Sequence, residues 1–191
     1  LCEDLFAPGE NKKHFYVFDF CRNFEFFNAN PKGINGSKTE SISARIFKTT
    51  ILLAEAFSEE PYMDDYHQNV RKEYLEWCHG RVKALVKENF QVRMKFKYVE
   101  KFNKPDVWYS LNETDKYEIF EHLADLIYIP ENDELAKRFD LLILNFQMAI
   151  VEASVIQDRY ESNIRVIAKK LSKLLNINAV AREKATIQAV Q

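Results

Sequence analysis

The sequence predicts a mainly α-helical fold, a multi-helix bundle, and three observations support this prediction. The 191 residues include only 4 Gly and 5 Pro, the residues that most often interrupt helices. They also include 15 Phe and 9 Tyr, and hydrophobic residues make up 47% of the chain, which is enough to form a core. From about residue 41 onward, apolar side chains recur at the spacing of helix faces.

The first segment differs from the rest. Residues 14–20, HFYVFDF, are aromatic, β-branched and mostly apolar, which is typical of a strand buried on both faces of a sheet. No second convincing strand follows in the sequence. We therefore expect one N-terminal strand whose neighbours lie outside this sequence. The first residue is Leu1 instead of Met, which also suggests a larger parent protein.

A loop, NANPKGING at 28–36, precedes the first predicted helix. Ser37, Thr39 and Ser41 offer N-cap oxygens for this helix, which should run through about Phe57. Pro61 follows and prevents its continuation, because the residue before a proline avoids helical geometry. Residues 63–87 should form the second helix. The side chains expected to be buried are Ile42, Ile46, Ile51, Leu52 and Phe57 in the first helix, and Tyr66, Val70, Tyr74, Trp77, Val82 and Leu85 in the second.

Further helices are predicted over 89–102, 113–128, 134–156, 160–175 and 179–190. Asn112 or Thr114 should cap the helix at 113–128, with Glu118 placed to help close the cap. We expect the helix at 134–156 to be the central core element, because its apolar residues surround most of its circumference. These residues are Leu141, Leu142, Leu144, Phe146, Ile150 and Val151.

The charge is distributed unevenly, although the net charge of −2 gives no indication of a nucleic-acid partner. Residues 66–104 contain ten Lys and Arg against four Asp and Glu, whereas residues 105–152 contain three against eleven. A basic helical surface can contact phosphates, or the basic and acidic helices can neutralise one another within the bundle. Residues four apart share a helix face, so we expect Lys83 with Lys87, and Arg93 with Lys97, to lie together. The candidates for contact with DNA or a partner protein are Arg71, Lys72, Arg81, Lys83, Lys87, Arg93, Lys95, Lys97 and Lys101.

No catalytic motif is found. The sequence contains no Gly-rich phosphate loop, no HExxH, no GxSxG and no paired cysteines. Three cysteines, an odd number, favour a reducing cytoplasm over a disulfide framework or a zinc site. We also expect no signal peptide and no membrane span, because the longest apolar stretch, 141–156, is too short. The prediction is a chain with no catalytic residue, metal or cofactor of its own, and without ATPase or nuclease activity.

Three segments resemble the restriction (motor) subunit of type I restriction-modification enzymes and related helicase proteins. LCEDLFAPGENKKHFYVFDFCRNFEFF at 1–27 is similar to the continuation of the last helicase motif in that family. VRMKFKYVEKF at 92–102 and ELAKRFDLLILNFQMAIVE at 134–152 resemble two of its later helices. The resemblance implies that residues 1–30 end the second RecA-like helicase domain and that residues 37–191 form a helical C-terminal domain.

The resemblance further implies a cytoplasmic protein of a bacterium or archaeon. The parent would bind ATP and Mg²⁺, translocate and cleave double-stranded DNA, and assemble with methyltransferase and specificity subunits. The catalytic groups would lie upstream, so no catalytic residue is assigned here. The region's role would be assembly with the methyltransferase core, and DNA contact. The alternative is a stand-alone helical DNA-binding or protein-interaction adaptor, although an adaptor would have no use for a lone buried strand.

Overall fold

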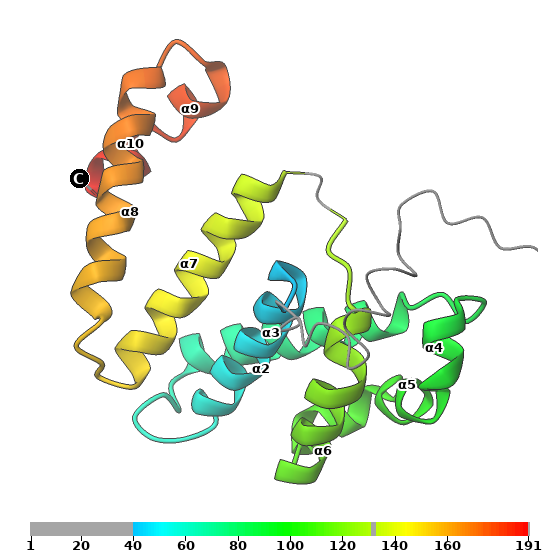
Figure 1. The fold of residues 1–191 in the computed structure, drawn as a ribbon. Coiled ribbons are helices and arrows are strands. Elements are labelled where there is room, and N and C mark those ends of the chain that lie inside the picture. Colours follow the sequence, from blue (N-terminus) through cyan, green and yellow to red (C-terminus); the bar gives the residue numbers. More distant parts are fainter. Residues whose placement is uncertain (1–39, 131–132, 191) are drawn as a thin grey trace, which may run out of the picture. The chain divides into compact units, whose positions relative to one another are not determined.

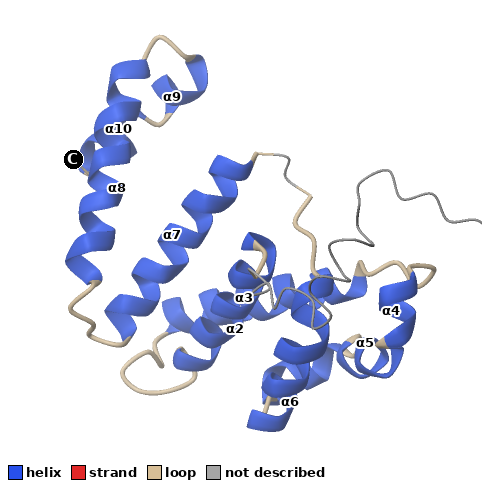
Figure 2. Ribbon diagram, viewed as in Figure 1, coloured by secondary structure: helices blue, strands red, loops and turns tan. Residues whose placement is uncertain are grey.

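Helix α2, Ile42–Ala56, is the central element of the fold and packs against α3, α7 and the short helix η3 (Figure 1). The fold is a computed structural model that describes residues 40–130 and 133–190. These ranges are mainly helical and contain no strand, as Figure 2 shows. The predicted strand at 14–20 and the proposed domain at 1–30 lie outside the described residues.

The other elements follow α2 in chain order. They are the helices α3 (Asp65–Lys83), α4 (Phe90–Met94), α5 (Phe96–Phe102) and η1 (Pro105–Ser110); α6 (Glu113–Glu118), the π-helical turn η2 (Ile119–Leu123) and η3 (Ala124–Leu126); and α7 (Glu134–Val151), α8 (Gln157–Leu171), η4 (Ser172–Leu174), α9 (Asn178–Arg182) and α10 (Lys184–Ala189). The mainly helical prediction is confirmed.

Helix α2 begins as the sequence predicts. The side chain of Ser41 accepts a hydrogen bond from the backbone N–H of Ala44, which satisfies one of the free donors of the first turn. Eight of the 15 residues of α2 are buried, more than a single helix face provides. Leu52 is an exception to the predicted set, since it is 38% exposed.

Two apolar clusters lie against α2. The larger one contains Phe47 and Trp108, whose ring centroids are 6.3 Å apart in an edge-to-face arrangement, and it extends to α3, α5, η1 and η2. The smaller one joins Leu53 and Phe57 of α2 to Leu141 of α7. Because both clusters include α2 side chains, α2 is the helix that holds the fold together.

The prediction that 134–156 would be the central core helix is wrong. Only four of the 18 residues of α7 are buried, Leu142 is half-buried and Ile150 is 42% exposed. Apolar residues do surround α7, but within the described chain it packs mainly against α2 and α8, with a further contact to Tyr74 of α3. A broad apolar circumference is therefore not sufficient for burial on all sides.

Helix α7 also ends five residues earlier than predicted. Ala153 has a left-handed backbone (φ 48°), with its N–H bonded to the carbonyl of Ile150. The N–H of Ser154 bonds to the carbonyl of Ala149 at 2.9 Å. This pair of bonds is the Schellman arrangement, which usually has Gly at the left-handed position. No Gly or Pro marks this end in the sequence, so it was not predictable.

Four other predicted helices differ from the structure, and the last of them, at 179–190, is two helices, α9 and α10, separated at Glu183. The helix at 63–87 is α3, which ends at Lys83, and Tyr66 is 70% exposed instead of buried. The helix at 89–102 is two helices, α4 and α5, separated at Lys95 (φ −110°, ψ 18°). The helix at 113–128 changes to a π turn after Glu118, and Asp115 closes the Asn112 cap in place of Glu118. No described helix is long and apolar enough to cross a membrane.

The last four helical elements, α8 to α10 with η4, form a C-terminal arm over residues 157–190. Helix α8 packs against α7 after a short turn, and α10 packs against α8 (Figure 1). Within this arm only Ala168 is buried. The arm is therefore the least enclosed part of the described chain.

Candidate functional site

Three of the nine predicted basic residues are held by the fold itself. The Nε of Arg71 donates to the carbonyl oxygen of Ala54 in the last turn of α2 (3.1 Å). The Nζ of Lys72 lies 3.8 Å from a carboxylate oxygen of Glu76, one turn further along α3. The third, Lys101, links α5 to α6. These three side chains thus already have partners within the chain.

Lys101 lies between two carboxylates of α6. Its Nζ is 2.6 Å from Asp115 and 2.7 Å from Glu118, and these partners raise the pKa of Lys101. Burial opposes the charged form of Asp115, but the hydrogen bonds from Lys101 and from the Asn112 N–H outweigh it and lower the pKa of that carboxyl. Both groups therefore stay charged at neutral pH, and the ion pair stabilises the α5–α6 contact.

The remaining cations gather between the end of α3 and the start of α5. Arg81 lies with its guanidinium carbon 5.0 Å from the centroid of the Trp77 ring. The Nζ of Lys87 is 5.7 Å from the Phe96 ring, and that of Lys97 is 4.5 Å from the Tyr98 ring. Of the nine predicted residues, only Lys72 and Lys101 form ion pairs within the described part of the chain. Five of those without an ion pair follow one another in the sequence after α3 begins its last turn: Lys83, Lys87, Arg93, Lys95 and Lys97.

The local backbone explains how these five residues are arranged. Helix α3 ends at Lys83, and the Asn89 side chain starts α4 by accepting the N–H of Gln91. Lys87 therefore lies in the connecting turn, and the prediction that Lys83 and Lys87 share a helix face is wrong in its geometry. The same holds for Arg93 and Lys97, which lie on two different helices. Lys83, Lys87 and Phe96 nevertheless line one shallow pocket of about 140 Å³.

Large apolar side chains are exposed among these cations. Phe90 is 72% exposed and Met94 is 71% exposed, and the two lie four residues apart on α4. Val86 is 61% exposed in the turn before α4. We call this surface the 83–97 patch, and it consists of Lys83, Val86, Lys87, Phe90, Arg93, Met94, Lys95, Phe96 and Lys97. Sequence reasoning identified its cations and missed its apolar members, because a continuous 89–102 helix was expected.

The groups most often used in catalysis have structural surroundings. Burial raises the pKa of the Cys78 thiol well above its usual value, which makes it a poor nucleophile. His79 donates to the backbone oxygen of Asn103 (2.9 Å), and the ring of His122 stacks on Tyr98 with centroids 3.9 Å apart. The described residues contain no cluster of three or more His, Cys, Asp or Glu able to hold a metal ion.

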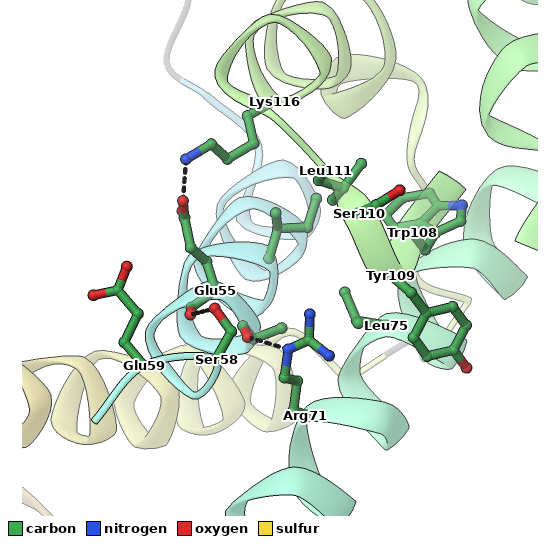
Figure 3. Close-up of a pocket in the computed structure, with 12 residues that line it drawn as sticks. Glu55, Ser58, Glu59, Arg71, Leu75, Trp108, Tyr109, Ser110, Leu111 and Lys116 are labelled. Atoms are coloured by element: carbon green, nitrogen blue, oxygen red, sulfur yellow. Dashed lines mark hydrogen bonds and ion pairs between the residues drawn. The ribbon is translucent and has the colours of Figure 1, made fainter. Parts of the chain in front are cut away.

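A cavity of about 270 Å³ lies between α2, α3 and η1 (Figure 3). Arg71 projects into it from α3, whereas the buried Lys116 of α6 pairs with Glu55 and Glu113 at its edge. Its apolar wall includes Leu75 and Trp108. Sequence reasoning did not predict this cavity, because its lining residues lie as far apart in the chain as Ile51 and Lys116.

Comparison with known proteins finds no matching family model, no matching curated protein and no matching solved structure. Functional inference therefore rests on two local features of the chain. The first is the exposed 83–97 patch, and the second is the cavity that contains Arg71.

Proposed function

We propose that this chain is a helical docking region whose role is assembly, and that the 83–97 patch is its docking surface. The observation that carries this proposal is the exposure of Phe90 and Met94 among five cations that lack ion pairs within the described chain. Exposed apolar side chains of this size are typical of interaction sites when they gather on one surface. When a partner covers water-exposed Phe and Met side chains, the free energy of the complex is lowered.

The chemistry of the patch indicates the kind of partner. Apolar side chains at the centre of an interface supply most of the affinity, whereas charges around them set orientation and association rate. Five of the six charged residues from Lys83 to Lys97 are positive, and Glu88 is the exception. The complementary surface would therefore be apolar with an acidic rim.

The resemblance to type I restriction enzymes gives this partner a specific identity in the proposal. The methyltransferase core, together with the specificity subunit, would be the structure to which the region attaches. ATP, Mg²⁺ and DNA cleavage would belong to upstream parts of the parent, in the cytoplasm of a bacterium or archaeon. A stand-alone helical adaptor is the alternative, and it would use the same patch.

Contact with double-stranded DNA is a second candidate function, favoured by the five cations. Binding through these side chains would be independent of sequence and strongly dependent on salt, with a Kd no tighter than about 10⁻⁶ M at physiological salt. Phosphates need no apolar contact, so DNA binding would leave the exposure of Phe90 and Met94 unexplained. Protein docking explains both kinds of side chain and is the stronger proposal.

Two variants of the complete subunit separate these functions. The first, Phe90→Ser with Met94→Ser, removes apolar area and keeps every charge. The second, Lys87→Glu with Arg93→Glu and Lys97→Glu, reverses the charge. Protein docking predicts that both variants weaken binding to the methyltransferase core by at least about tenfold, equivalent to about 1.4 kcal/mol. DNA contact predicts that only the charge variant loses binding in a gel-shift series from low to high salt.

Leu135→Ser is the matched control, since Leu135 is 74% exposed on α7, away from the patch. It should bind the core as the parent protein does. If the apolar variant binds the core as tightly as the control, the patch is not the docking surface.

A further inference from the structure

We propose that the cavity between α2, α3 and η1 binds a ligand that carries a single carboxylate, with Arg71 as the residue that binds it. This inference goes beyond the docking function, because the cavity and the 83–97 patch have no residue in common. The proposed docking function does not require a small-molecule site, so this ligand site is an additional assignment.

The geometry of Arg71 supports the proposal. Its Nε donates to the carbonyl oxygen of Ala54 at 3.1 Å, and this bond fixes the plane of the guanidinium. The guanidinium carries five N–H donors, so four remain on the terminal nitrogens. Figure 3 shows these nitrogens projecting away from α2 into the cavity, where they form no other hydrogen bond or ion pair within the described chain. They present the two parallel donors that a carboxylate accepts.

The wall of the cavity indicates the body of the ligand. Leu111 and Tyr109 offer the apolar surface that a ligand can reach, whereas Ile51, Leu75 and Trp108 lie behind it and are at most 3% exposed. Small-molecule sites combine such apolar walls with a few polar groups that fix orientation. A volume of about 270 Å³ accommodates a compact group of the size of an aromatic ring with its carboxylate. We therefore expect an apolar body attached to the anionic group.

The charges of the lining favour a carboxylate over a phosphate. Glu55 and Glu59 line the same cavity as Arg71 and Lys116, so the formal charges of these four residues cancel. Lys116 already pairs with Glu55 and Glu113, which leaves Arg71 to meet the ligand. A dianionic phosphate would be repelled by two nearby carboxylates, whereas a planar monoanion matches the guanidinium and carries less charge.

The shared chemistry has two possible sources, a free small carboxylate and the C-terminal carboxylate of a peptide. The complete chain is titrated with sodium phenylacetate, with a short peptide that ends in Phe, with the same peptide amidated, and with inorganic phosphate. Binding is followed by NMR at the indole N–H of Trp108 and at the Nε–H of Arg71. We expect saturable shifts with phenylacetate or the free-acid peptide, and none with the amidated peptide or phosphate. If only phenylacetate binds, the ligand is a free small carboxylate. If only the free-acid peptide binds, the ligand is the C-terminus of a peptide chain.

Arg71→Lys keeps the charge and removes the paired donors, so it should weaken binding by at least about tenfold. Lys72→Met is the control: it changes the neighbouring exposed residue and should bind as the parent does. Ser110→Phe fills the cavity from η1 and should also abolish binding, and this variant serves if Arg71→Lys does not fold. The proposal is overturned by the absence of saturable shifts with either carboxylate, by equal binding of phosphate, or by unchanged binding in a folded cavity variant.

Discussion

Helices α2 and α8 are both amphipathic and 15 residues long, yet they differ greatly in burial. Eight residues of α2 are buried, against Ala168 alone in α8. The apolar stripe of α8 is the more regular of the two, with Tyr160, Ile164, Ile167 and Leu171 at helical spacing. The pattern of a helix therefore defines which face can be buried, whereas the number of neighbouring elements determines how much of it is buried.

The polar contacts of the two regions differ in the same way. Around α2 they join distant segments: the Lys116 ammonium pairs with Glu55, and the Tyr74 hydroxyl donates to Gln147 of α7 at 2.9 Å. In the arm, Arg165 pairs with Glu161 on the same helix (2.6 Å) and donates to the carbonyl of Val190 at its end. The arm thus stabilises mainly itself, and we expect it to open at lower free energy than the core.

Phe47→Ala should produce the largest loss of stability, and it tests the region around α2. Phe47 is fully buried against Trp108, so its truncation leaves a cavity and should cost about 3–5 kcal/mol in the free energy of unfolding. Urea denaturation measures this value. Val166→Ala on α8, where the side chain is 48% exposed, is the control and should stay within about 0.5 kcal/mol. Equal losses for the two variants would remove the distinction between the regions.

Helix α7 contacts both regions, and two of its leucines test which of its faces is buried. Leu144 is 8% exposed, and Leu144→Ala should cost about 2–3 kcal/mol. Leu142 is only half-buried, so Leu142→Ala should cost about 1 kcal/mol, less than the 2–5 kcal/mol expected of a fully packed leucine. The same denaturation experiment compares the two variants. A larger loss of unfolding free energy for Leu142→Ala than for Leu144→Ala would show that the opposite face of α7 is the buried one.

Asp115→Asn tests the polar part of the core. Asp115 caps α6 and pairs with Lys101, but the Lys101 side chain is 40% exposed, so we expect a loss of about 1–3 kcal/mol at neutral pH. The pKa of Asp115 in the folded state lies below 3.8, the value of an aspartate carboxyl in the unfolded chain. Its contribution is therefore complete above pH 3.8 and disappears as the pH falls through the folded-state pKa. Chemical denaturation at decreasing pH should show the parent and the variant converging below 3.8, and a constant difference would contradict this.

Ala153→Gly should give the smallest effect, in the opposite direction. Ala153 adopts φ 48°, a left-handed conformation that costs a non-glycine residue about 1–2 kcal/mol. Glycine avoids this cost but loses about 0.5–1 kcal/mol through its greater freedom in the unfolded chain. The net result should be a stabilisation of up to about 1 kcal/mol, measured as a higher denaturation midpoint. Ala149→Gly, within α7, is the matched control and should destabilise the protein.

Local rules predicted the helix starts and failed at several helix ends. Ser41 and Asn112 each cap a helix as expected, because an N-cap depends on one side chain and the next turn. The breaks at Lys95 and Ala153 involve no Gly or Pro, so none of the local signals that usually mark a helix end is present in the sequence. The choice of α7 over α2 as the central helix was also wrong: hydrophobic content is visible in a sequence, whereas the number of neighbours is not.

The candidate site was predictable only in part. The cations of the 83–97 patch were identified from charge counts, and Arg71, Lys72 and Lys101 were named with them. Their partners, Ala54, Glu76 and Asp115, became evident only in three dimensions, and two of these partners lie on other helices. The interpretation of these residues as DNA or partner contacts stays a prediction.

The position of Trp77 and Trp108 has a practical consequence for spectroscopy. They are the 2 tryptophans of the sequence, and both belong to the cluster around Phe47, with Trp108 only 1% exposed. Tryptophan fluorescence, excited selectively at wavelengths that tyrosine does not absorb, therefore reports the environment of α2, α3 and η1 and does not report on the arm, whereas far-ultraviolet circular dichroism averages over every helix. If the arm melts first, the two probes will give transitions that do not coincide, and a two-state analysis of either curve will not apply. One unmodified sample thus records the order in which the two regions unfold.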